Sequence, residues 1–140
     1  MTRRGFNIIE LTIALAVVAI LSAIALPRAG GLIDSIEVRG AVTEIEALFS
    51  TARHAAIARA SQSTLNIDVA RGIISVQVGA DTIKTREVAR AHRVTLQTTR
   101  PSITYAPTGL GYGAANLSLI VSRNRIADTV VVSRLGRVRH

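Results

Sequence analysis

The amino-acid sequence predicts an α+β fold, in which one long N-terminal helix packs against an antiparallel β-sheet domain. Residues 11–26 carry no charge and predict a membrane-spanning first half of the helix. Apolar positions then recur at three- and four-residue spacing to about residue 60, which predicts that the helix continues. From residue 62 onward, about seven short stretches alternate with period two. No helical pattern separates these stretches, which argues against parallel βαβ units.

The apolar segment has the length of a membrane span. From Phe6 to Leu26 the chain has 21 residues, and at ~1.5 Å rise per residue this helix covers roughly 30 Å, the thickness of a bilayer core. Arg3 and Arg4 precede the segment. By the positive-inside tendency they place the N-terminus in the cytoplasm and everything after Pro27 outside it.

Glu10 lies near the start of this apolar segment. An acid at the centre of a spanning helix costs ~2.5–3.5 kcal/mol, less near the interface, and is normally paired. One interpretation is that Glu10 lies at the cytoplasmic headgroups and snorkels. In the other, cleavage between Gly5 and Phe6 creates an α-ammonium on Phe6, one helical turn away, which neutralises Glu10 within one chain or between neighbouring chains.

The N-terminal sequence Arg-Arg-Gly-Phe-Asn-Ile-Ile-Glu-Leu-Thr, followed by an apolar run to Pro27, resembles the prepilin signature. This signature belongs to type IV pilins and type II secretion pseudopilins. The resemblance implies that prepilin peptidase cleaves after Gly5 and methylates the new N-terminus at Phe6. It also implies that Glu10 guides assembly with other pilins or pseudopilins through the N-terminal helix, and that Pro27 is the familiar proline of that helix.

The resemblance further implies a domain order and a location. We expect a leader peptide at 1–5, a transmembrane and assembly helix at 6–27, its amphipathic continuation at 28–61, and an antiparallel β globular domain at 62–140. The expected location is the bacterial inner membrane, crossed once, with the C-terminal domain in the periplasm and the protein associated with a filament after assembly. An ordinary secretory signal peptide is the competing interpretation, since residues 23–25 satisfy its small-residue cleavage rule. An acid near the start of the apolar core is unfavourable for such a signal.

The second half of the predicted helix carries one apolar stripe. Gly30 and Gly31 each lower helix stability by ~1 kcal/mol relative to alanine, so we expect a bend there rather than a domain break. The stripe comprises Ile45, Leu48, Phe49, Ala52, Ala55 and Ala56.

The predicted strands cover residues 65–69, 73–78, 82–88, 94–98, 102–105, 117–121 and 128–133, the last with a continuation through 135–138. Turns are predicted at 70–72, 79–81 and 123–125, and a loop at 107–116.

Three later segments refine the resemblance. Residues 52–59, 105–109 and 131–139 resemble the helix end and later motifs of the GspH/FimT group of minor pilins and pseudopilins. The resemblance implies a structural component of a filament tip or assembly complex, in a type II secretion or a type IV pilus system.

The charge is strongly positive and unevenly distributed. The chain has a formal net charge of +8 and no cysteine, so disulfides and thiolate metal sites are excluded. From residue 90 onward there are eight arginines and one aspartate, a balance of 8 − 1 = +7.

No catalytic constellation is recognisable. His54, His92 and His140 have no partner at metal-ligand spacing, and no Ser/His/Asp arrangement is evident. The glycine-rich stretch at 109–113 is not followed by a helical pattern, so a turn is favoured over a phosphate loop. We therefore expect neither enzymatic activity nor a cofactor.

The basic C-terminal segment is the one candidate for binding chemistry. Guanidinium groups there match phosphate oxygens, which makes sequence-independent DNA binding during uptake the alternative function. For the FimT side of the group, the resemblance implies a C-terminal glycine-arginine motif, matched here by residues 136–139. The candidate residues are Arg123, Arg125, Arg134, Gly136, Arg137 and Arg139. A solvated basic face, or pairing with acids of another subunit, is the competing interpretation.

Overall fold

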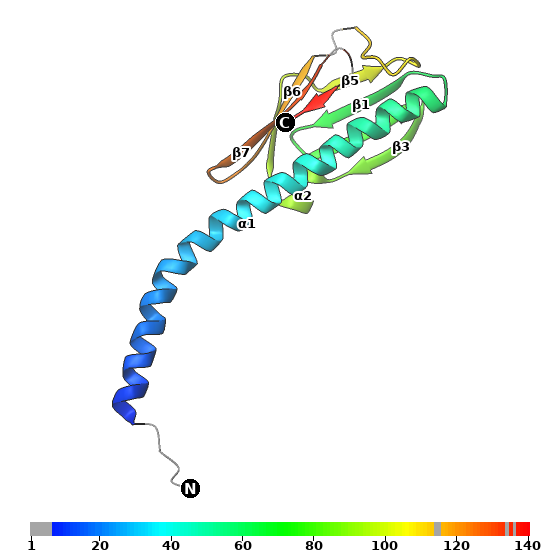
Figure 1. Ribbon diagram of the computed structural model, residues 1–140. Helices are drawn as coiled ribbons and strands as arrows, with labels where there is room; N and C mark the ends of the chain where they lie inside the picture. Colours follow the sequence, from blue (N-terminus) through cyan, green and yellow to red (C-terminus); the bar gives the residue numbers. More distant parts are fainter. Residues whose placement is uncertain (1–6, 114–115, 134, 136) are drawn as a thin grey trace. The chain divides into compact units, whose positions relative to one another are not determined.

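The computed structural model describes residues 7–113, 116–133, 135 and 137–140 (Figure 1). Gly5, Phe6, Arg134 and Gly136 therefore lie outside the described residues. The elements in chain order are α1 (Ile8–Ala58), β1 (Ser63–Asp68), β2 (Ile73–Val78), β3 (Asp81–Arg86), α2 (Val88–His92), β4 (Thr95–Thr98), β5 (Ser102–Tyr105), β6 (Leu117–Arg123), β7 (Ile126–Val132) and β8 (Val138–Arg139).

Helix α1 begins at Ile8, and Asn7 caps it. The Asn7 side-chain Oδ1 accepts the backbone N–H of Ile9 at 3.2 Å, and the Asn7 carbonyl accepts the N–H of Leu11 at 3.1 Å. The helix is continuous across Gly30 and Gly31. The chain divides into two compact units, residues 1–33 and 34–140, with the boundary just beyond the two glycines.

The core of the second unit forms between α1 and two β-sheets. From residue 38 onward, α1 buries one stripe of apolar side chains, which includes five of the six predicted positions. Its fully buried members are Val38, Ala41, Val42, Ile45, Leu48, Phe49, Ala52 and Ala56. The inward-facing strand residues complete this core. Strands β1, β2, β5 and β6 alternate buried and more exposed positions as predicted, whereas β3 does not.

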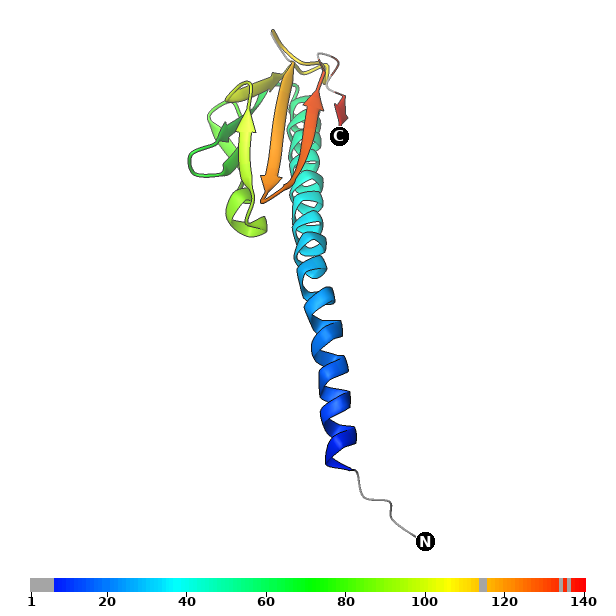
Figure 2. The ribbon, with the colours of Figure 1, turned by 90° about the vertical axis from the view of Figure 1, so that its left-hand side faces the viewer.

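The strands form two antiparallel four-stranded sheets in the described part of the chain, where one sheet was expected. Sheet A has the order β3-β2-β1-β5, and sheet B has the order β4-β6-β7-β8. In sheet B the turn between β6 and β7 and the short strand β8 lie at opposite ends of β7 (Figure 2).

The predicted hairpin around residues 70–72 is confirmed as the β1–β2 connection. Gly72 has a φ of +66°, and a Cβ built there would lie 2.1 Å from the Cβ of Ala89 in α2. Only glycine fits a left-handed position against which another backbone segment is packed this closely.

Two predictions about the ends of strands were also wrong. The sequence predicts a strand that ends at residue 88 and no helix before the next strand at residue 94, but residues 88–92 form α2. Its five residues are too few to show helical periodicity, and Arg93 ends it at a φ of 52°. The last strand was predicted to continue through 135–138. Instead the chain reverses after β7: the N–H of Ser133 donates to the carbonyl of Arg137 at 2.9 Å, and β8 pairs back with β7.

Candidate functional site

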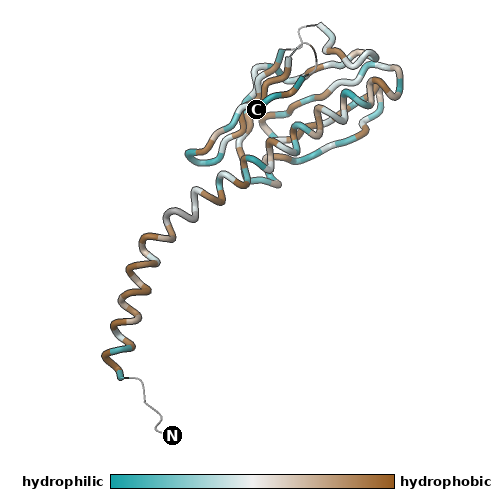
Figure 3. The backbone as a smooth tube through the Cα atoms, viewed as in Figure 1, coloured by the Kyte–Doolittle hydropathy of each residue, from teal (hydrophilic) through white to brown (hydrophobic). Residues whose placement is uncertain are grey.

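The first candidate surface is the apolar segment of α1, coloured brown in Figure 3. It is long and apolar enough to cross a membrane, and the most apolar part of it has no buried residue. Its large side chains are at least half exposed: Ile8, Ile9, Leu11, Ile13, Leu15, Val17, Val18, Ile20, Leu21, Ile24 and Leu26. Such a surface needs hydrocarbon or other apolar helices around it.

Glu10 lies in the first turn of this segment. Its side chain is exposed, and it has no hydrogen bond or ion pair within the part of the chain that the structure describes. An acid in the first turn is favoured by the helix dipole. Pro27 lies within α1 and does not end it.

The basic candidates do not form one patch. Arg123 Nε lies 2.8 Å from Asp34 Oδ1, and its Nη1 lies 3.9 Å from Glu37 Oε1 and donates to the His92 carbonyl at 3.2 Å. The side chain of Arg123 is only 16% exposed, and its guanidinium group is already paired with acids of this chain. This corrects the expectation that its guanidinium forms part of an exposed binding surface.

Arg125 is exposed but lies in the β6–β7 turn, at the other end of β7 from β8. Val131, which pairs with Arg139, is five residues along β7 from Ile126, or roughly 17 Å at ~3.3 Å per residue. Arg137 and Arg139 are also exposed, and neither has an ion-pair partner among the residues described. The two ends of β7 thus present separate positive charges.

Acidic residues of α1 form a chain of ion pairs that sequence reasoning missed. His92 lies between two carboxylates: its Nδ1 is 3.4 Å from Glu37 and its Nε2 is 3.0 Å from Glu44. The other side of Glu44 contacts Arg86 Nε at 3.4 Å. We call Asp34, Glu37, Glu44, Arg86, His92 and Arg123 the α1 ion-pair chain. The sequence shows Asp34, Glu37 and Glu44 on the predicted helix, but it gives no indication of their partners.

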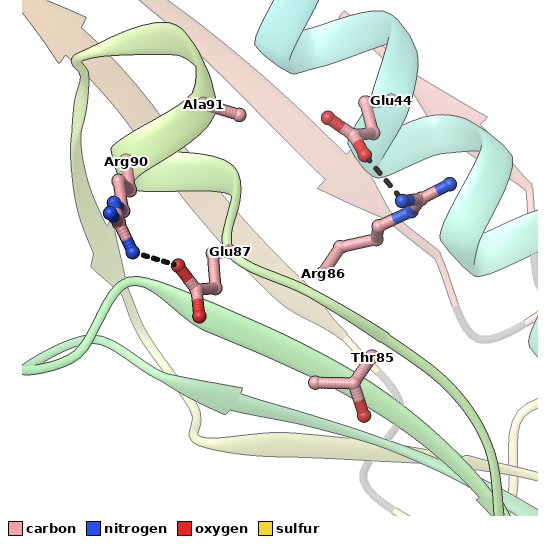
Figure 4. Close-up of a pocket in the computed structure, with 6 residues that line it drawn as sticks. All are labelled: Glu44, Thr85, Arg86, Glu87, Arg90 and Ala91. Atoms are coloured by element: carbon pink, nitrogen blue, oxygen red, sulfur yellow. Dashed lines mark hydrogen bonds and ion pairs between the residues drawn. The ribbon is translucent and has the colours of Figure 1, made fainter.

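The charged side chains that line the pocket beside the α1 ion-pair chain pair with one another. The pocket has a volume of about 500 Å³ and lies between α1, the end of β3 and α2 (Figure 4). Arg86 pairs with Glu44, and Arg90 Nη1 lies 3.3 Å from Glu87 Oε2. These charged side chains neutralise one another, which leaves little to attract a charged ligand. Within the described ranges, no cluster of three or more histidine, aspartate or glutamate side chains could hold a metal.

The segments 52–59 and 105–109 meet in space. A Cβ built on Gly109, whose φ is +77°, would lie 2.8 Å from Ile57 Cδ1 and 3.2 Å from Arg53 Nε. Tyr105 is fully buried below them. This burial raises the pKa of Tyr105 to about 12, against the opposing effect of the Arg53 charge. Arg53 Nε and Tyr105 Oη are buried and have no hydrogen-bond partner among the described residues.

Comparison with known proteins identifies the fold. No family model and no curated protein matches the chain. A crystal structure of the type IV minor pilin FimU from Pseudomonas aeruginosa (strain PAO1) is similar with a TM-score of 0.66 and 17% identity, over 75% of this chain and 88% of that one. A second crystal form of FimU gives a TM-score of 0.60 and 12% identity, over 72% and 90% of the two chains. The long N-terminal helix, the antiparallel sheets and this similarity show that the chain has the fold of a type IV pilin subunit.

Proposed function

We propose that this chain is a minor pilin or pseudopilin, a non-catalytic subunit of a type IV pilus or type II secretion filament. The observation that carries the proposal is the exposed apolar segment of α1 in a chain with a pilin fold. An uncovered apolar helix that bears one acid, unpaired among the described residues, is suited to a bilayer before assembly and to a bundle with the apolar helices of other subunits after it.

The delivery of the subunit follows the same proposal. Prepilin peptidase removes residues 1–5 and methylates Phe6, the helix at 6–27 crosses the bacterial inner membrane once, and the domain after it lies in the periplasm. Residues 28–61 continue the helix and 62–140 form the globular domain. Mass spectrometry of the mature chain tests this step: a first residue at Phe6 with one added methyl group supports it, and a chain that starts just after residue 25 contradicts it.

Assembly depends on Glu10 in this proposal. Its carboxylate pairs with the α-ammonium of Phe6, on the same chain or a neighbour. This pairing avoids the free-energy cost of an unpaired charge in hydrocarbon. We expect Glu10→Ala to reduce incorporation into filaments about tenfold or more while the globular domain stays folded. Glu10→Asp, which keeps the charge, is the matched control. Normal incorporation of Glu10→Ala removes the assembly role from this residue.

A DNA-binding minor pilin is the second candidate function. It is favoured by the exposed Arg125, Arg137 and Arg139, which lack acidic partners in the described part of the chain. The full chain in neutral detergent is titrated with duplex DNA at two salt concentrations. Phosphate contacts predict an affinity that falls steeply with salt and drops when Arg137 and Arg139 are changed to glutamine. Undetectable binding at low salt leaves the structural function alone.

A further inference from the structure

We propose that the end of sheet B near β8 docks an acidic protein segment that also carries apolar side chains. The docking surface comprises Val131, Ser133, Leu135, Arg137 and Arg139, which line a hollow of about 370 Å³. The inference deepens the proposed function, because it names the chemistry of a partner at the globular end of a filament subunit.

The first argument is the apolar floor of the hollow. Val131 is 45% exposed and Leu135 is 61% exposed. In the ladder of sheet B, Val131 is paired with Arg139, so the two side chains emerge on the same face. Exposed apolar side chains beside a guanidinium form the kind of mixed surface that is enriched at protein interfaces.

The second argument is charge. Alternation along the strands places nine residues on the outer face of sheet B, namely Thr95, Gln97, Ser118, Ile120, Ser122, Ala127, Thr129, Val131 and Arg139. None of them is acidic, and Arg139 is the only charge. Asp128 lies on the other side of β7, where it lines a different hollow with Arg39 and His140. Arg139 is therefore left without a carboxylate from this face. Arg137 also lines a second hollow with Glu46, but within the described residues it makes no ion pair there, and Glu46 Oε1 lies 2.8 Å from His140 Nδ1. Both guanidinium groups are available to the carboxylates of a partner.

The apolar floor and the two guanidinium groups together match an extended chain that alternates apolar and acidic side chains.

A nucleic-acid backbone is the alternative occupant, and it accounts for the arginines alone. Phosphates pair with guanidinium groups but offer nothing to Val131 and Leu135. The two occupants are therefore separated by the effect of the apolar side chains on binding.

The test uses the full chain in neutral detergent and a short fluorescent peptide that alternates leucine and aspartate. Matched peptides carry lysine in place of aspartate, or serine in place of leucine. We expect saturable binding of the first peptide only, weakened about tenfold or more by Leu135→Ser and by the double variant Arg137→Gln/Arg139→Gln. Arg100→Gln, an exposed arginine elsewhere, is the control and leaves binding unchanged.

Equal binding of the serine-containing peptide overturns the inference, because the surface is then a charge patch without apolar recognition. Absence of saturable binding at low salt also overturns it. Binding of duplex DNA that is lost in the arginine double variant but retained in Leu135→Ser, without binding of the leucine–aspartate peptide, assigns the surface to DNA instead. Because the assay involves no filament, it fails or succeeds independently of the incorporation test with Glu10→Ala.

Discussion

The imidazole of His92 lies against Gly40 of α1, where a Cβ would come within 3.1 Å of the ring atoms Cε1 and Nδ1. Gly40 therefore opens the space in which His92 contacts both Glu37 and Glu44. A glycine inside a helix weakens it by ~1 kcal/mol relative to alanine. At this position the missing side chain permits a contact between α1 and His92, the last residue of α2.

Gly40→Ala is expected to lower the free energy of unfolding, although alanine is the better helix former. The ring of His92 is held at both nitrogens and cannot move away without loss of its carboxylate contacts. In a His92→Ala background the same change is expected to stabilise the protein by ~1 kcal/mol. Urea unfolding followed by circular dichroism measures this double-mutant cycle. A gain of stability from Gly40→Ala alone contradicts the tight contact.

Gly72→Ala and Gly79→Ala form a matched pair. Both glycines have a positive φ, at +66° and +60°, so each alanine carries the left-handed penalty of ~1–2 kcal/mol. Only at Gly72 does the added Cβ also overlap Ala89, whereas no atom lies within 4 Å of a Cβ at Gly79. We expect Gly72→Ala to cost at least about 3 kcal/mol and Gly79→Ala about 1–2 kcal/mol. Equal losses in urea unfolding argue against the packing of α2 on this turn.

Arg123→Gln is expected to destabilise the domain by about 3 kcal/mol. The change removes the charged partner of Asp34 at a site where the two side chains are 16% and 14% exposed, and leaves Asp34 only the hydrogen bond from Asn124 Nδ2 at 2.8 Å among the contacts described. Arg100→Gln, at an exposed arginine without an ion pair in the described chain, is expected to change stability by less than about 0.5 kcal/mol. In the double variant with Asp34→Asn, the loss is expected to be smaller than the sum of the single losses.

The burial of Tyr105 predicts a stability that falls at high pH. Its pKa is about 12 in the folded protein, against about 10 when exposed, so the unfolded chain releases the proton first. The contribution of Tyr105 to the free energy of unfolding is complete below pH 10. It is lost as the pH rises through 12, by about 2–3 kcal/mol in total. Tyr105→Phe removes this part of the pH dependence, and Tyr112→Phe, at a tyrosine that is 61% exposed, retains it. Parallel pH profiles for the native protein and Tyr105→Phe contradict the assignment.

Local sequence patterns predicted the elements whose periodicity is long or strictly alternating. The apolar stripe that includes Ile45 and Phe49, and most strand positions, were predictable because burial on one face repeats every 3.6 or two residues. Helix α2 was missed because one turn and a half of helix has no measurable period. The return of β8 depends on a reversal between Ser133 and Arg137, which no turn dipeptide announces.

The sequence predicts the total charge of the basic residues, but not how they are distributed over the surface. The sequence shows that Arg123, Arg125, Arg137 and Arg139 are close along the chain, but not that β7 separates them into two groups. The ion pair between Arg123 and Asp34 could not be predicted from the sequence either, since Asp34 lies on a helix about 90 residues earlier. Pairing over such distances is decided by how the sheets pack on the helix, for which a single sequence carries no local signal.

The α1 ion-pair chain also determines how the domain responds to force. Arg86, His92 and Arg123 come from separate segments of the globular domain. Arg86 and His92 share Glu44, His92 also contacts Glu37, and Arg123 contacts Asp34, so the contacts are spread along α1 from Asp34 to Glu44. Tension applied along this part of the helix is therefore carried by all three contacts at once, as in shear. The contacts cannot be broken one after another as in the opening of a zipper, so the helix and the sheets are expected to separate only under a load that exceeds their combined resistance.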